Sequence, residues 1–256
     1  MILLIDAGNT RIKWALVAPE AAPGAWTQQA LAAHGAAQEA AAHWQQARIT
    51  AVWIANVAGA TVRAHLQEVL ASTLPGVPLH WFASASRACG LENGYREPTR
   101  LGCDRFAAAI GAHRLFPQQA LLVANCGTAT TLDAISAQGR FIGGMILPGL
   151  GTMANSLNRQ TAQLPPVQYS QAGVVHLADN TEQAIVSGCI AAQIGAIEQA
   201  LRLMRAQSPQ VLCILSGGAA SVLGAALQEP HQVLDNLVLH GLQAVAQQAL
   251  TEEKTD

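Results

Sequence analysis

Three short turns in the sequence combine glycine with side chains that could hold a phosphate group. Each follows an apolar run, and they are Asp6-Ala7-Gly8-Asn9-Thr10, Asn125-Cys126-Gly127-Thr128 and Ser216-Gly217-Gly218. Glycine lets backbone N–H groups approach a polyanion closely, and threonine hydroxyls add further donors. A single turn of this kind carries little information, because tight turns need glycine anyway. Three of them, each after an apolar run, favour a protein that binds phosphates.

Asp6 and Lys13 flank the first of these turns. A carboxylate at the end of a buried strand is unfavourable unless it is paired or binds a cation. Mg²⁺ is commonly held by one or two carboxylates together with substrate phosphates, so Asp6 is a candidate ligand. Lys13 lies on the strand that returns from the turn and could reach a phosphate. Two simpler interpretations stay open, namely Asp6 as a turn cap and Lys13 as a solvated strand charge.

A second cluster, Leu101-Gly102-Cys103-Asp104-Arg105, stands at the start of a predicted helix. A carboxylate in the first turn of a helix gains about 0.3–1 kcal/mol from the helix dipole, so capping is one role for Asp104. Phosphoryl transfer to an alcohol, however, needs an acceptor for the hydroxyl proton, and aspartate can fill that role. The adjacent Arg105 suits recognition of a substrate carboxylate.

Composition and missing motifs exclude several classes of protein. Charged residues make up 12% of the 256 residues and the net charge is −2, so we expect no nucleic-acid partner. No apolar run reaches the roughly 20 residues of a membrane span, so we expect no membrane association. The five cysteines are scattered, which is typical of free thiols in a reducing, cytoplasmic compartment. Neither a P-loop nor a dinucleotide fingerprint is present.

The elements that must position these residues alternate between apolar strands and helices. We predict strands at 1–5, 12–17, 51–57, 79–83, 121–124, 131–136, 141–147 and 211–215. We predict helices at 28–47, 60–71, 103–116, 151–157 and 180–207, then a final pair, with a loop over 87–100. Asp179 and Glu182 form a capping-box pattern before the 180–207 helix.

The pattern of the first residues recurs near the middle of the chain. The apolar run 121–124 leads into Asn125 as the run 1–5 leads into Asp6, and both turns are followed by a predicted strand. We therefore predict two related α/β halves, residues 1–117 and 118–256, with a nucleotide cleft between them. No low-complexity linker separates them, which favours halves that are joined directly.

The motifs taken together resemble those of type III pantothenate kinases, from residue 2 to about residue 218. They are Asp6-Ala7-Gly8-Asn9-Thr10-x-x-Lys13, Leu101-Gly102-x-Asp104-Arg105, Cys126-Gly127-Thr128-Ala129-Thr130, Gly143-Gly144-x-Ile146-x-Pro148-Gly149 and Asn180-Thr181. The resemblance implies the fold of the acetate and sugar kinase, Hsc70 and actin superfamily, with actin-like (ribonuclease H-like) halves, and a homodimer. It also implies ATP-dependent phosphorylation of pantothenate to 4′-phosphopantothenate, the first step of coenzyme A synthesis.

The resemblance implies a role for each matching residue. Asp104 resembles the acceptor of the proton from the pantothenate hydroxyl, and Thr128 resembles a second ATP contact. The residues that resemble the phosphate and Mg²⁺ turn are Asp6, Ala7, Gly8, Asn9, Thr10, Arg11, Ile12 and Lys13. The residues that resemble substrate-binding positions are Tyr95, Gly102, Cys103, Asp104, Arg105 and Thr181.

Asn125 departs from the family pattern. The family usually has aspartate here, linked to a monovalent cation that is commonly potassium. Asparagine offers a carbonyl oxygen without a charge, so we expect use of K⁺ or NH₄⁺ through a weaker or differently built site. Two other functions stay open: a kinase of the same superfamily that acts on a sugar or an acid, and an accessory protein that has lost catalysis.

Overall fold

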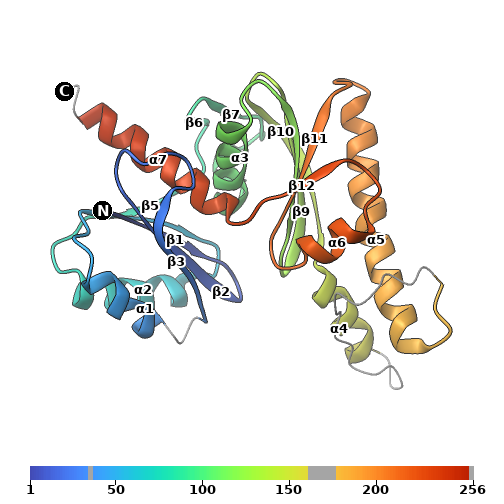
Figure 1. The fold of residues 1–256 in the computed structure, drawn as a ribbon, viewed down its shortest axis with the longest axis horizontal. Coiled ribbons are helices and arrows are strands. Elements are labelled where there is room, and N and C mark those ends of the chain that lie inside the picture. The colour runs from blue at the N-terminus through green and yellow to red at the C-terminus, as the bar shows by residue number, and fades with distance from the viewer. Residues whose placement is uncertain (34–36, 161–176, 254–256) are drawn as a thin grey trace. The chain divides into compact units, whose positions relative to one another are not determined.

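The computed structural model describes residues 1–33, 37–160 and 177–253, which form two compact units (Figure 1). Unit 1 comprises Met1–Pro117 and Asn236–Asp256, and unit 2 comprises Gln118–Asp235. The predicted second half, residues 118–256, differs from unit 2 at its end. The last helix, α7 (Leu237–Glu253), returns to unit 1 because it packs along α3 (Cys103–Leu115). Glycines at the crossing, Gly111 and Gly241, let the two backbones touch.

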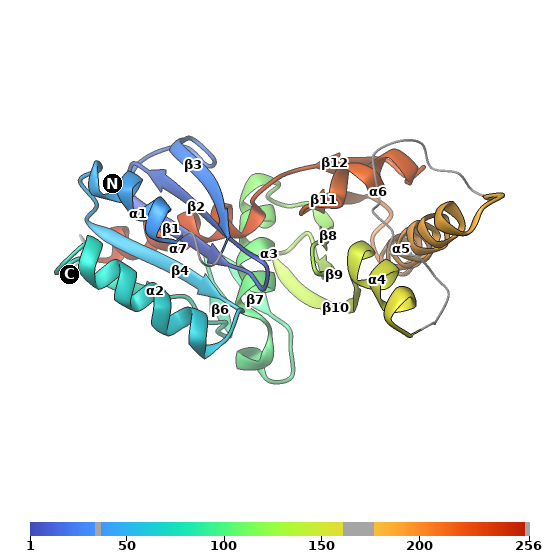
Figure 2. The ribbon, with the colours of Figure 1, turned by 90° about the horizontal axis from the view of Figure 1, so that it is seen from below.

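Unit 1 is built on a five-stranded sheet in the order β3-β2-β1-β4-β5. Its strands are β1 (Ile2–Ala7), β2 (Arg11–Val17), β3 (Trp26–Ala33), β4 (Ala51–Asn56) and β5 (Leu79–Trp81). The first three are antiparallel neighbours, whereas β4 and β5 run parallel to β1. Helices α1 (Ala37–Gln45) and α2 (Ala60–Thr73) cover one face, and α7 covers the other (Figures 1 and 2). The predicted hairpin around Gly8 is thereby confirmed.

The prediction of a helix over residues 28–47 is wrong in its first part. Residues 26–33 form β3, and α1 begins only at Ala37. β3 pairs with β2 along its length, and these ladder bonds override the helix preference of alanine and glutamine. The predicted loop over 87–100 also contains regular elements, namely β6 (Arg87–Ala88), β7 (Leu91–Asn93) and the 3₁₀ turn η2 (Pro98–Arg100).

Unit 2 repeats the topology of unit 1. Its strands follow the order β10-β9-β8-β11-β12. The first three are antiparallel neighbours, whereas β11 and β12 run parallel to β8. They are β8 (Ala120–Cys126), β9 (Ala129–Ile135), β10 (Arg140–Pro148), β11 (Val211–Ser216) and β12 (His231–Val233). Helices α4 (Leu150–Gln160), α5 (Thr181–Arg205) and α6 (Ala220–Ala226) pack on one face of this sheet. The shared strand order confirms the prediction of two related α/β halves.

The long helix α5 begins one residue away from its predicted cap. The side chain of Asn180 accepts a hydrogen bond from the Gln183 N–H at 3.0 Å, so Asn180 caps the helix instead of Asp179. Among the described helices, α5 alone is long and apolar enough to cross a membrane. Its buried side chains, which include Ile190 and Ile197, belong to the core of unit 2, and this accounts for its apolar composition.

Candidate active site

Asp6 and Lys13 face each other across the β1–β2 hairpin. The ladder pairs them directly, and residues paired in this way project from the same face of a sheet. Burial raises the pKa of Asp6 from 3.8 to about 7; the positive charge of Lys13 opposes the rise, and the negative charge of Asp104 adds to it. The structure therefore brings both Lys13 and Asp104 within electrostatic reach of Asp6. The turn between the strands is closed by a hydrogen bond from the Gly8 N–H to the Arg11 carbonyl, 3.1 Å long.

Asp104 lies in the first turn of α3, which starts after Gly102 without a side-chain cap. Its Oδ1 accepts a hydrogen bond from the Arg105 N–H at 2.8 Å. Burial raises the pKa of Asp104, although this hydrogen bond and the Arg105 charge act in the opposite direction. A Cβ on residue 102 would lie 2.8 Å from that Oδ1, so glycine here leaves the carboxylate its place.

Arg105 is buried and engages Tyr95. Its side chain is 5% exposed, and its Nη1 donates a hydrogen bond to the Tyr95 hydroxyl at 2.8 Å. The guanidinium carbon also lies 5.7 Å from the centre of the Tyr95 ring, within the range of a cation–π contact. Two predicted substrate-binding residues that are ten positions apart in sequence are therefore in direct contact.

The turn after β4 adds Asn56 to this site, which the sequence analysis did not single out. Asn56 lies beside Ala7 in the sheet, and its carbonyl faces the Cys103 sulfur at 3.6 Å. Its side chain closes the turn by accepting from the Ala58 N–H and donating to the Gly59 carbonyl. A weaker signal was present, because Asn56 ends an apolar strand as Asn125 does, although its glycine, Gly59, follows three residues later and not two.

In unit 2 the second glycine turn is enclosed by backbone. Asn125 pairs with Thr131 on β9, and the Gly127 N–H donates to the Ala129 carbonyl at 3.0 Å. The Thr128 carbonyl accepts from the Gly149 N–H at 3.0 Å and from the Thr152 hydroxyl at 2.7 Å.

The third glycine turn packs against the second. Gly217 has φ +91°, and a Cβ there would lie 2.7 Å from the Cys126 carbonyl oxygen. The Ala219 N–H donates to that same oxygen at 3.0 Å. Two of the three turns singled out in the sequence are therefore neighbours within unit 2, and their backbones are in contact.

Thr181 is the first residue of α5 and lies in unit 2. It lines an apolar cavity of about 450 Å³ together with Met153, Leu157 and Ile185. Tyr95 and residues 102–105 belong to unit 1. The predicted substrate-binding residues are therefore divided between the two units.

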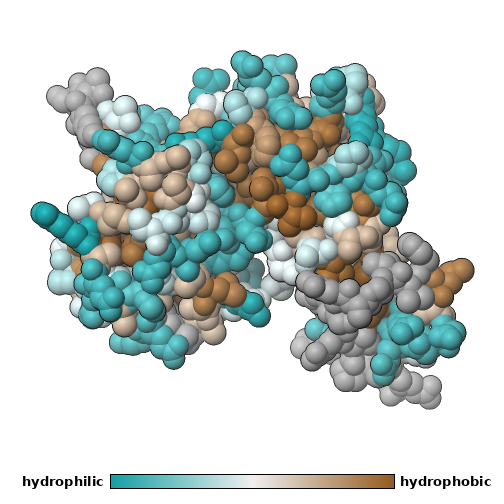
Figure 3. All heavy atoms as spheres, viewed as in Figure 1, coloured by the Kyte–Doolittle hydropathy of each residue, from teal (hydrophilic) through white to brown (hydrophobic). Residues whose placement is uncertain are grey.

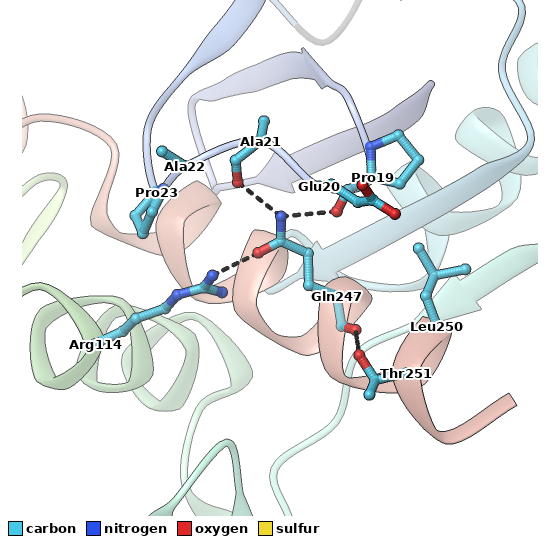
Figure 4. A pocket seen from close by; sticks show the side chains of 9 residues that line it. All are labelled: Pro19, Glu20, Ala21, Ala22, Pro23, Arg114, Gln247, Leu250 and Thr251. Carbon is cyan, nitrogen blue, oxygen red and sulfur yellow. Dashed lines mark hydrogen bonds between the residues drawn. The ribbon is translucent and has the colours of Figure 1, made fainter. Parts of the chain in front are cut away.

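Two further cavities contain none of the predicted site residues. One, of about 410 Å³, lies between α3, α7 and the loop after β2, where Arg114 and Gln247 meet (Figure 4). The other, of about 370 Å³, lies between α5 and the sheet of unit 2, and no charged side chain lines it. Ile142 and Leu203, both exposed, line this cavity. Figure 3 shows that hydrophobic side chains interrupt the otherwise hydrophilic surface elsewhere as well.

Comparison with known proteins identifies relatives along almost the whole chain. Residues 2–203 match the sequence profile of a family described as type III pantothenate kinase. A type III pantothenate kinase from Janthinobacterium sp. (strain Marseille) is 53% identical over 253 residues, which are 96% of this chain and 97% of the relative. Another, from Herminiimonas arsenicoxydans, is 49% identical over 251 residues, with the same coverage.

Solved structures share the fold at low sequence identity. The structure of a candidate 2-dehydro-3-deoxygalactonokinase from Sinorhizobium meliloti matches with a TM-score of 0.57 at 14% identity and covers 98% of this chain and 99% of its own. At this identity the likeness concerns the fold alone, and it confirms the predicted actin-like kinase fold.

Proposed function

The chain belongs to the type III pantothenate kinase family, and on that premise we propose which of its residues carry out the reaction. The protein phosphorylates pantothenate with ATP, in the biosynthesis of coenzyme A. The observation that supports our assignment is the group around Asp6 in unit 1: Lys13 faces Asp6 in the ladder, and the charges of Lys13 and Asp104 both act on its carboxyl group.

Asp104 accepts the proton of the reacting hydroxyl. The hydroxyl oxygen of pantothenate attacks the γ-phosphorus of ATP, the bond to the β,γ-bridging oxygen breaks, and ADP leaves with that electron pair. The hydroxyl proton passes to the carboxylate of Asp104, whose pKa is raised by burial. A raised pKa suits this role, because a proton acceptor works best when its pKa approaches the working pH.

The β1–β2 turn holds the phosphates of ATP. Residues 7–12 form the phosphate-binding turn, and Lys13 supplies a positive charge on the same face as Asp6. In unit 2, Thr128 makes a second contact with ATP, from a turn whose backbone is fixed by Gly149 and Thr152.

Asp6 fits a divalent cation, which the kinase family uses and which we propose to be Mg²⁺. Its half-buried carboxylate lies close to the second carboxylate of Asp104, and this repulsion is relieved by a cation. When bound, the ion neutralises charge that develops on the transferred phosphoryl group.

Asn125 contributes a carbonyl oxygen to a monovalent cation site, for K⁺ or NH₄⁺. Its ladder partner Thr131 donates a hydrogen bond to the buried carboxylate of Asp133 at 3.3 Å. A carboxyl group thus lies two residues along β9 from Thr131 instead of at position 125, which supports a differently built site.

Substrate-binding residues surround the proton acceptor. Gly102, Cys103 and Arg105 flank Asp104, and Tyr95 contacts Arg105. Thr181 binds substrate from α5. We assign no contact to nucleic acid, and we assign the protein to the cytoplasm, where its five free cysteines stay reduced.

A homodimer is formed through the exposed face of α5. Ala191 and Ala192 are exposed on this helix, and a Cβ on Gly188 or Gly195 would meet nothing within 4 Å. Small residues in such a row permit a second helix to approach closely. Sedimentation equilibrium of Gly188→Glu against the native chain tests this, with a monomer expected for the variant.

Asp104→Asn tests the assignment of the proton acceptor. We expect kcat to fall by about 10²–10⁴-fold, because a neutral amide cannot take up the proton, while calorimetric ATP binding is retained. Asp235→Asn is the matched control, since Asp235 is exposed on a loop of unit 2, and it should keep the native rate.

Three further outcomes would refute parts of this proposal. A native rate for Asp104→Asn would refute its role as proton acceptor. A tenfold preference for a sugar over pantothenate in a panel of alcohols, or no heat with both ATP and pantothenate, would refute the substrate assignment.

A further inference from the structure

Asn93, the last residue of β7, is buried, and both the NH₂ group and the oxygen of its side-chain amide make hydrogen bonds. The residue is 6% exposed. Its Nδ2 donates to the carbonyls of Ala85 and Pro98, both at 3.0 Å, and its Oδ1 accepts from the Tyr95 N–H at 3.1 Å. Its own N–H donates to the Ser86 carbonyl at 2.9 Å.

These bonds tie three separate pieces of chain to one side chain. They join the segment after β5, the backbone of Tyr95, and the start of η2. Of the side chains of this size, only an amide can donate twice and accept once with the same planar group. An aspartate would present a second oxygen to two carbonyls, and an alanine would leave both carbonyls without their donor.

Tyr95 is the residue through which this arrangement reaches the substrate-binding group. Its hydroxyl accepts from buried Arg105, which is adjacent to Asp104 in the first turn of α3. We propose that Asn93 is a positioning residue for pantothenate, because it fixes the backbone of Tyr95 and so the Tyr95–Arg105 contact beside Asp104. This inference rests on the proposed function, since it requires Tyr95 and Arg105 to bind pantothenate.

Gln243 on α7 provides a matched control in the same unit. It is 0% exposed, and its Nε2 donates to the carbonyls of Ala21 and Ala22 at 3.2 and 3.0 Å. Its Oε1 accepts from the Gly24 N–H at 3.0 Å. One helical turn on, Gln247 repeats this pattern on the same loop (Figure 4). Gln243 thus donates to two loop carbonyls as Asn93 does, and its Oε1 also accepts from the Trp26 indole N–H at 3.2 Å, but the loop carries none of the proposed site residues.

The isosteric pair Asn93→Asp and Gln243→Glu separates positioning from stability. Both variants should lower the melting temperature, because each places a carboxylate against two carbonyls. Only Asn93→Asp should raise KM for pantothenate, by roughly tenfold, with KM for ATP unchanged. An unchanged KM for pantothenate in Asn93→Asp, or an equal rise in Gln243→Glu, would overturn the proposal.

A double-mutant cycle shows whether Asn93 acts through Tyr95. In a Tyr95→Ala background, Asn93→Asp should raise KM for pantothenate by less than about threefold, because the side chain that it positions is absent. A full tenfold rise in that background would overturn the proposal. If Asn93→Asp yields no folded protein, Asn93→Ser replaces it, with the same direction expected and an unchanged KM as the contrary result. Native protein that is inactive on pantothenate would instead refute the proposed function.

Discussion

The β1–β2 turn of unit 1 and the β8–β9 turn of unit 2 occupy the same place in the five-strand order that the two units share, but they differ in charge. Asp6 is paired with Lys13 in the first, and Asn125 with Thr131 in the second. The first loop has four residues, 8–11, between paired positions, and the second has three, 127–129. The repeat therefore preserves the hairpin and replaces a pair of opposite charges by two neutral side chains.

The surroundings of the two turns differ as well. The nearest atom to a Cβ on Gly8 would be the Arg11 oxygen at 3.5 Å, an ordinary contact. A Cβ on the equivalent Gly127 would likewise lie 3.5 Å from the Ala129 oxygen, but the second turn also packs against Gly149, where a Cβ would collide with the Gly127 carbonyl and lie 2.8 Å from that of Thr128. We infer that the first turn works through its charged side chains, whereas the second works through a rigid backbone.

Removing the charge of the first turn should have the largest effect. Asp6→Asn makes this turn resemble the second, and we expect kcat/KM for MgATP to fall by roughly 10³-fold because the metal loses its carboxylate. The ligand-free variant should nevertheless melt at a higher temperature than the native chain at pH 8, because a buried charge next to Asp104 is gone. Steady-state kinetics and calorimetry measure both; full activity in Asp6→Asn would show that the charge is dispensable.

Gly149, which packs against the second turn, should matter for stability, whereas Gly8 in the first turn should not. We expect Gly149→Ala to lower the free energy of unfolding by about 1–3 kcal/mol, because its methyl group meets backbone atoms that cannot move aside. Gly8→Ala should stay within about 0.5 kcal/mol of the native chain. Urea unfolding followed by circular dichroism compares the two; equal losses would contradict the difference in packing.

The pH dependence of activity should follow the ionisation of Asp6 in the first turn. With a pKa of about 7 in the free protein, Asp6 is ionised above that pH and protonated below it. We expect kcat/KM for MgATP to fall about tenfold per pH unit below pH 7, and excess Mg²⁺ should shift this limb to lower pH because the ion favours the carboxylate.

The same shift has the opposite consequence for the stability of the ligand-free protein. The folded state holds the Asp6 proton more tightly than the unfolded state. Protonated Asp6 therefore adds to the free energy of unfolding below pH 3.8, and this stabilisation is lost as the pH rises through about 7. The comparison of native protein with Asp6→Asn from pH 5 to 8 measures it. A difference in melting temperature that is independent of pH would refute the assignment.

Giving the second turn a charge should produce the smallest effect. Asn125→Asp adds a carboxylate to the proposed monovalent-cation site, and we expect half-maximal activation to need roughly fivefold less K⁺. Activity titrated with KCl at constant ionic strength measures this. No change in the K⁺ requirement would remove Asn125 from the site.

Local pattern predicted much of the fold and of the site. Apolar runs and glycine turns predicted the hairpin around Gly8, the helix that begins at Cys103 and the recurrence of the strand pattern at Leu121. The pairing of β3 was missed because its alanine and glutamine residues favour a helix, and only the neighbouring strand β2 overrides that preference.

The sequence by itself determined the residue types at the turns, the most apolar strands of each half and, through a joint pattern of motifs, the family. Only the tertiary structure decided which distant groups meet: Cys103 with Asn56, Gln243 with Ala21, and α7 with unit 1. The physical reason is that periodicity reports whether a residue is buried but not its partner. Partners are set by strand order and helix crossings, which bring together groups that lie far apart in the sequence.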